Sequence, residues 1–432
     1  MRTLRCDCMI PAQECGRMST IALTHRRVAV SRHGFGFWAV AFAFLATLAY
    51  SAIPTPLYGI YQHRDGFSSF MITVIFGVYA VGVVVSLFTV GHLSDWYGRR
   101  RLVVPALLAS IASALSFLLW RDLTGLLVAR VVSGLAVGAI TATATAWLAD
   151  LHAADRPSAS PRRPQIVSTA ANLGGIGLGP LVAGVLAQWV RSPLTVPYLV
   201  SLGALVLALA LVIASPETRE RVTPRLPYRP QRVSIPTQAM ARYLAATVTA
   251  AVLFAAFGLF TSLAPTFLAV TLHHPSHALA GANAFVVFGS AVVAQMAIAA
   301  RPAREALAAG IPVMVGGLAL VVTAVWLSTP SLALFLTGGA LTGAGAGLLF
   351  KSAIAIVAEI APPERRAEAL AGMFLAGYMG LALPVIGLGA LTQFLAPTTS
   401  LLIFSAVLVL GILIASPVLF DRHPKPPAAA TA

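Results

Sequence analysis

The stretch GHLSDWYGRRR (Gly91–Arg101) concentrates charge in a chain that is otherwise strongly apolar. It follows FMITVIFGVYAVGVVVSLFTV (70–90) and precedes LVVPALLASIASALSFLLW (102–120). A helix of about 20 apolar residues crosses the roughly 30 Å of hydrocarbon in a bilayer. The polar stretch is therefore predicted to be a loop between two membrane-spanning helices.

The rest of the chain repeats this pattern of long apolar runs and short polar connections. Its 432 residues are 58% hydrophobic and 10% charged, with a mean hydropathy of +0.86. Backbone groups in lipid must be satisfied within the segment, and the runs lack the alternation of barrel strands, so helices are expected. We predict an all-α polytopic membrane protein with twelve spans, at 34–54, 70–90, 102–120, 124–149, 165–190, 194–214, 243–271, 278–300, 306–327, 331–358, 368–393 and 397–420.

The arginines predict the orientation of these spans. Most of the 29 Lys and Arg residues fall in alternate connections and in the tails, whereas the other connections contain only Arg64, Arg121 and Arg191. Cationic loops stay in the cytoplasm, so both termini are expected there, in a plasma or inner cell membrane. An anionic leaflet then accounts for the net charge of +15 without a nucleic-acid partner. The predicted segments are a basic tail 1–33, a six-helix bundle 34–214, a linker 215–242, a second bundle 243–420 and a tail 421–432.

All three cysteines, Cys6, Cys8 and Cys15, lie in the first tail. Their spacing matches no zinc pattern and supplies too few ligands, so we expect neither a metal nor a cofactor. Met18 is an alternative start. The first apolar run is full-length and lacks an obvious cleavage site, which indicates a retained helix.

The two predicted bundles have a weak internal similarity. One shift of the sequence places Gly134 on Gly343 and Gly138 on Gly347. Parallel six-helix repeats around a midplane site are a known plan of transporters. Chance alignment of a Gly- and Ala-rich chain is the alternative.

The opening loop resembles the signature loop of the major facilitator superfamily. The resemblance rests on Gly91, Asp95, Gly98, Arg99 and Arg100 at fixed spacing between spans two and three. It implies two six-helix bundles that rock about a central cavity, and a cytoplasmic latch formed by these residues. We expect Asp95 to dock on the start of span eleven, near Arg365 and Arg366, with a solvated acid as the alternative. Trp96 departs from the family, which often has Arg at that position.

Span four carries a cation within the membrane. Arg130, Gly134 and Gly138 recur every fourth residue and share one helix face, where the glycines permit close packing. A buried arginine is costly unless it is paired, hydrated or able to reach the interface. The run resembles the fourth-helix motif of the superfamily, which implies a coupling role for Arg130.

Span five contains NLGGIGLGPLVAG, in which Gly175, Gly179, Pro180 and Gly184 weaken the helix and admit a close neighbour. This run resembles the antiporter motif of exporters in the superfamily, from which it departs at Ala183. Helix packing alone is the alternative interpretation.

Lys351 in span ten is the second intramembrane cation. Its long stem could reach the interface, or its amine could face the cavity. The superfamily lines its cavity with helices one, four, seven and ten, which implies Tyr50, Thr143, Phe257 and Lys351 as cavity residues.

These features predict a secondary transporter rather than an enzyme, because we find neither a GxxxxGK[ST] loop nor a cluster of catalytic side chains. No acid lies clearly within a span, so proton antiport follows only from the resemblance. Two intramembrane cations favour an anionic or neutral small molecule. We predict a monomeric drug or metabolite exporter in the lipid bilayer, with protons as the candidate coupling ion. An uptake permease or uniporter, and a non-transporting sensor, are the alternatives.

Overall fold

The computed structural model describes residues 12–90, 97–160, 162–219, 231–236 and 239–421. Within these ranges it contains no strand, and twelve helices are long and apolar enough to cross a membrane. The predicted all-α polytopic class is confirmed. Gly91, Asp95 and Trp96 lie outside the described residues, as do Cys6 and Cys8, and so the docking of Asp95 stays a prediction.

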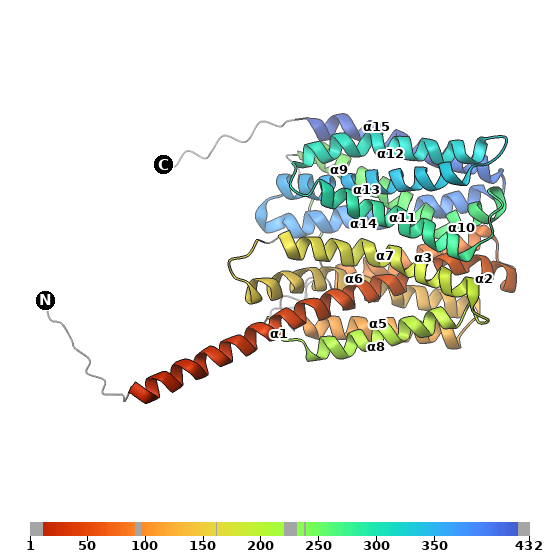
Figure 1. The fold of residues 1–432 in the computed structure, drawn as a ribbon. Helices are drawn as coiled ribbons and strands as arrows, with labels where there is room; N and C mark the ends of the chain where they lie inside the picture. Colours follow the sequence, from red (N-terminus) through yellow and green to blue (C-terminus); the bar gives the residue numbers. More distant parts are fainter. Residues whose placement is uncertain (1–11, 91–96, 161, 220–230, 237–238, 422–432) are drawn as a thin grey trace.

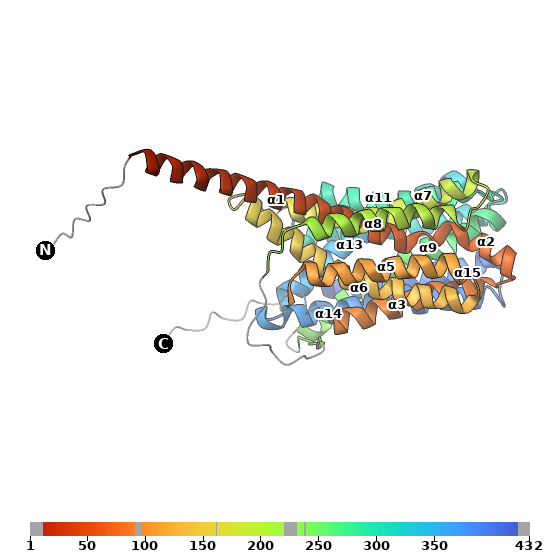
Figure 2. The same cartoon turned by 90° about the horizontal axis from the view of Figure 1, so that it is seen from below.

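The helices form two bundles that lie side by side (Figure 1), and Figure 2 shows them from below. The first bundle contains α1 (Ala12–Ala52), α2 (Tyr58–Asp65), α3 (Ser69–Thr89), α5 (Arg100–Leu119), α6 (Leu123–Asp155), α7 (Arg162–Trp189) and α8 (Val196–Ala214). The second contains α9 (Met240–Ser262), α10 (Ala264–Thr266), α11 (His277–Ala297), α12 (Ala303–Trp326), α13 (Leu332–Ile360), α14 (Arg366–Leu391) and α15 (Pro397–Phe420).

The two ends of this helix assembly are distinguished by the segments that they carry. We call the end at which α15 finishes and α5 begins the terminal face, and the end that carries α2 and α10 the distal face (Figure 1). Four helices that begin at the distal face have a side-chain cap. Ser68, Asp122, Ser276 and Ser331 accept a hydrogen bond from the backbone three residues later. These bonds satisfy amides that the first helical turn leaves free.

The described part of the first helix begins at Ala12, inside the segment predicted as a tail. The predicted first span, 34–54, finishes close to the end of α1, whereas the predicted seventh span, 243–271, is not a single helix. α1 ends at Ala52, and Pro54 and Pro56 precede α2. α9 ends at Ser262, and Pro265 lies in α10. Proline donates no backbone hydrogen bond, which explains a break in each helix.

Glycines set the closest contacts within each bundle. A Cβ added to Gly134 or Gly138 on α6 would meet the backbone carbonyls of Tyr79 or Val83 on α3. The same pairing recurs in the second bundle, where Gly343 and Gly347 on α13 lie against the carbonyls of Val287 and Ala291 on α11. The helix pair α6–α3 therefore has a counterpart in α13–α11, in the register that places Gly134 on Gly343.

We predict that Gly134→Ala destabilises the protein although alanine is favoured over glycine in helices by about 1 kcal/mol. The added methyl group collides with the Tyr79 carbonyl, so α3 and α6 must separate. The measurement is the Tm of the purified protein in detergent. Gly203→Ala on α8 is the matched control, because nothing lies within 4 Å of its Cβ position. Equal Tm values for the two variants would contradict the packing argument.

Candidate substrate cavity

A cavity of about 280 Å³ lies between the two bundles. It extends from the helix breaks at Thr55 and Thr261 to Thr145 on α6 and Phe374 on α14. Both bundles contribute to its walls, so their relative movement would change its access. This is the geometry expected of a binding site between two repeats.

Arg130 is the one cation among the described residues that line the cavity. Its side chain is 2% exposed, its Nη1 donates to the Ser51 carbonyl at 2.7 Å, and its Nε donates to the Ile75 carbonyl at 3.4 Å. The guanidinium also lies 4.6 Å from the centre of the Tyr79 ring. The Ser51 carbonyl is free because α1 ends at Ala52, so the arginine caps the broken end of this helix. The Arg130 side chain is therefore satisfied inside the protein, and the alternative that it snorkels to the membrane interface is not observed.

The two bundles are joined by hydrogen bonds at the distal face. Pro265 has no N–H for the Thr261 carbonyl, which instead accepts from Thr55 Oγ1 at 3.0 Å. Beside this bond, Gln188 Oε1 accepts from the His277 amide at 3.0 Å, and His277 Nδ1 donates to the Pro56 carbonyl at 3.2 Å. Among the described residues, the direct hydrogen bonds between the bundles are confined to this region. The cavity is thus sealed at its distal end.

The glycines of α7 complete this seal. Gly175 and Gly179 lie against the backbone of α1 at Leu45 and Ala49. Gly184 meets the carbonyl of His277 on α11, and Gly281 of α11 meets the carbonyl of Pro180. The predicted motif therefore brings α7 close to a helix of its own bundle and to a helix of the other bundle.

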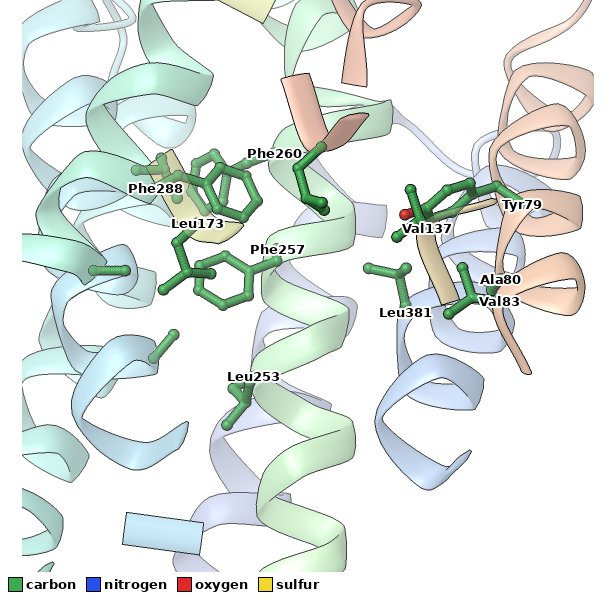
Figure 3. Packing of buried hydrophobic residues seen from close by; sticks show 14 of the residues in the cluster. Tyr79, Ala80, Val83, Val137, Leu173, Leu253, Phe257, Phe260, Phe288 and Leu381 are labelled. Carbon is green, nitrogen blue, oxygen red and sulfur yellow. The ribbon is translucent and has the colours of Figure 1, made fainter. Parts of the chain in front are cut away.

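Aromatic side chains cover much of the second bundle's wall. Figure 3 shows Phe257 and Phe288 gathered with Leu173 on one side of α9. The rings of Phe257 and Phe288 are stacked, with centroids 4.7 Å apart. Phe254 lies 5.2 Å from Tyr378 and 5.8 Å from Phe350 in edge-to-face geometry. Such pairs pack favourably and leave flat apolar faces.

The structure places the predicted cavity residues in different surroundings. Arg130 and Phe257 line the cavity, whereas Tyr50, Thr143 and Lys351 do not. Tyr50 is buried and donates to Ser113 Oγ at 2.6 Å. Thr143 is fully buried within the first bundle, so its position on α6 does not bring it into the cavity.

Lys351 binds the end of a neighbouring helix instead of the cavity. Its Nζ donates to the Ile298 carbonyl and, at 3.3 Å, to the Arg301 carbonyl. These carbonyls follow the end of α11 at Ala297, where the backbone carbonyls have no further N–H donors within the helix. The expectation of a cavity charge is corrected by this contact, and the alternative of a stem that reaches toward the terminal face agrees with it.

The described part of the signature loop contacts its own bundle. Gly98 has a φ of 100°, a left-handed conformation that favours glycine, and its Cβ position lies 2.8 Å from Glu217 Oε2. Glu217 accepts from the backbone amides of Arg99 and Arg100, each at 2.9 Å, at the start of α5. Arg99 is 4% exposed and pairs with Asp150 at 3.1 Å. Glu217 and Asp150 therefore hold the loop against α6 and the start of the linker.

Sequence reasoning missed most of the cavity wall. The missed residues share no motif and come from many helices: Ser51, Thr55, Thr141, Thr145, Ser168, Thr169, Asn172, Phe254, Phe288, Gln295, Phe350, Phe374 and Tyr378. A polar side chain within a long apolar run was the available signal for Asn172 and Gln295. The phenylalanines carried no such signal, because most aromatic residues in spans pack against other helices.

The family follows from a match along nearly the whole chain. The model of the Major Facilitator Superfamily matches residues 33–311 and 309–432. The chain belongs to this superfamily. It is a multi-pass membrane protein of a transporter family, as the opening loop indicated.

Individual relatives are distant. A bacillibactin exporter of Bacillus subtilis is 25% identical over 139 residues, which are 31% of this chain and 34% of that protein. A triacylglyceride transporter of Mycobacteroides abscessus is 31% identical over 209 residues, 45% of this chain and 36% of that protein. The aligned segments thus span about a third of the length of these curated relatives.

Solved structures of the superfamily share the fold over most of the chain. The crystal structure of a peptide transporter, POT, superposes with a TM-score of 0.71 at 14% identity and covers 89% of this chain and 94% of its own. A nucleoside transporter superposes with a TM-score of 0.68 at 11% identity and covers 89% of this chain and 100% of its own. At these identities the likeness concerns the fold alone.

We predict that Lys351→Met leaves substrate binding unchanged but lowers stability. The substitution removes the donor to the Ile298 and Arg301 carbonyls at the end of α11 and changes no residue that lines the cavity. The measurements are Tm in detergent and, once a transported compound is identified, its KM. A large rise in KM at unchanged Tm would instead make Lys351 a cavity residue.

Proposed function

We propose that this chain is an exporter that moves a small amphipathic molecule by alternating access, in exchange for protons. The observation that carries the proposal is a cavity that lies between two bundles and is sealed at the distal face. A cavity with one sealed end is suited to expose its contents to the two membrane faces in turn. The terminal face, which carries most of the arginines, is proposed to be cytoplasmic.

Three features support export over uptake. The α7 run Gly175–Gly184 resembles the antiporter motif, and it builds the distal seal together with α11. One of the relatives is named as an exporter. A cavity lined by rings and hydroxyl groups suits an amphipathic molecule better than a strongly hydrated nutrient.

Proton coupling is proposed without an acid in the cavity wall. Among the described residues that line the cavity, none is Asp or Glu. On α6, Asp150 pairs with Arg99 and Arg219 near the terminal face, and Asp155 at the end of the helix pairs with Arg156. Proton exchange through Asp150 or through the loop acid Asp95 is therefore the candidate route.

The test of direction is the accumulation of a panel of labelled amphipathic compounds in cells with and without the protein, at two external pH values. We expect at least one compound to accumulate less in cells that contain the protein, and more strongly so at the lower external pH. Increased accumulation would support the uptake alternative, and no change for any compound would favour a sensor. Export that does not depend on the external pH would contradict proton exchange but would leave the proposal of export standing.

We also predict that Thr55→Val weakens the distal seal. The variant removes the hydrogen bond to the Thr261 carbonyl, which contributes about 0.5–1.5 kcal/mol, or roughly two- to tenfold in an opening equilibrium. The measurement is the rate at which an impermeant maleimide, added outside the cell, labels a cysteine placed at Thr141 after the three native cysteines are replaced by serine. Thr392→Val is the control, because Thr392 Oγ1 bonds within its own helix to Gly389. An unchanged rate in Thr55→Val would mean that this bond does not hold the seal.

A further inference from the structure

The two walls of the cavity differ in chemistry, because most of its polar lining comes from the first bundle and most of its aromatic lining from the second. The first bundle contributes Arg130, Thr141, Thr145, Ser168, Thr169 and Asn172, which carry hydroxyl, amide or guanidinium groups. It also contributes the rings of Phe76 and Tyr79, which lie against the Arg130 guanidinium. The second bundle contributes six aromatic residues, with Thr261 and Gln295 as further polar groups; the aromatic residues are Phe254, Phe257, Phe288, Phe350, Phe374 and Tyr378. One wall can therefore bind hydrogen-bonding groups, and the opposite wall can bind a ring.

The polar wall carries a positive charge that lacks a neutralising acid. Arg130 Nε and Nη1 donate to backbone carbonyls, and no side-chain carboxylate is a partner of Arg130 within the described residues. Its Nη2 has no hydrogen-bond partner there either, and the residue lines the cavity. A buried cation is costly without a counter-charge, so an anion in the cavity would be stabilised by this guanidinium. A second cation in the same place would be repelled.

The aromatic wall presents two groups of rings. Phe257 and Phe288 stack with an interplanar angle of 18°, and so their faces are nearly parallel. Phe254, Phe350, Phe374 and Tyr378 form an edge-to-face chain, with Phe350 and Phe374 centroids 6.0 Å apart. A flat aromatic ligand can stack on such faces or meet their edges, with a gain beyond simple area burial.

We propose that the molecule this cavity takes is an aromatic organic anion, with its carboxylate or similar acidic group at Arg130 and its ring against the phenylalanines of the second bundle. The inference deepens, and rests on, the proposed function as an exporter. Because the two poles of the ligand touch different bundles, the ligand bridges the interface that must move. A molecule with only one of the two poles binds one wall and leaves the bundles uncoupled.

The test is equilibrium binding to the full chain purified in lipid nanodiscs, without any gradient. Three probes share one ring and differ in the polar group: 2-naphthoate, 2-naphthamide and 2-naphthylmethylammonium. Cyclohexanecarboxylate keeps the charge and removes the aromatic ring. We expect naphthoate to bind most tightly. The ammonium should bind at least about tenfold more weakly, because it cannot accept a hydrogen bond from Arg130. Cyclohexanecarboxylate should bind about two- to tenfold more weakly, because it keeps the charge but loses the contact between aromatic rings.

Variants separate the two poles. Arg130→Gln is expected to weaken naphthoate by about tenfold or more while changing naphthamide by about twofold or less. Arg130→Lys keeps the charge and should keep the preference for the carboxylate. Phe288→Leu should weaken all naphthyl probes alike and leave cyclohexanecarboxylate unchanged. Arg191→Gln and Phe394→Leu, both exposed, are the matched controls, and size-exclusion chromatography with Tm confirms that each variant is folded.

Several results would overturn the inference. They are ammonium binding as tight as that of naphthoate, equal weakening of all probes by Arg130→Gln in a folded protein, and no binding of any probe. Binding of naphthoate without its export in cells would uphold this inference and contradict the proposed function. Export of cations with no carboxylate preference would uphold export and contradict the inference.

Discussion

The need to satisfy every backbone carbonyl in an apolar medium underlies both the seal and the polar side of the cavity. Pro54, Pro56 and Pro265 interrupt the first and seventh spans, and each interruption leaves carbonyls without a helical donor. Arg130 satisfies the Ser51 carbonyl, and Thr55 satisfies that of Thr261. The first contact holds a cation at the cavity, and the second joins the two bundles. Both functional features are thus consequences of the same pair of helix breaks.

Helix ends also explain why two similar cations have different surroundings. Arg130 and Lys351 each lie in a long apolar helix, and both could be predicted from the sequence as intramembrane charges. Each donates a hydrogen bond to a carbonyl at the end of another helix, where the carbonyl has no backbone N–H donor within its own helix. The helix that Arg130 serves is broken at the cavity, whereas the helix that Lys351 serves ends toward the terminal face. The position of the partner helix, and not the residue type, decides which cation faces the cavity.

The contacts between the bundles differ between the distal face, where small residues meet, and the cavity, which large side chains line. At the distal face, Gly184 and Gly281 bring the backbones of α7 and α11 together. In the cavity wall, the stacked rings of Phe257 and Phe288 of the second bundle border the open space between the bundles. The proposed export and the proposed aromatic anion both depend on this contrast, because a ligand can bridge the bundles only where they do not touch.

The sequence by itself determined the helical class, the approximate spans and the importance of Arg130 and the glycines, because span length, charge bias and residue spacing are local properties. The breaks could have been suspected at the prolines, but their satisfaction by Arg130 and Thr55 joins residues far apart in the chain. Only the tertiary structure decided that Tyr50, Thr143 and Lys351 do not line the cavity and that eight aromatic residues from five helices line it. Within a uniformly apolar helix, side-chain hydrophobicity does not distinguish the face toward lipid, a neighbour or a cavity, so helix packing alone makes that choice.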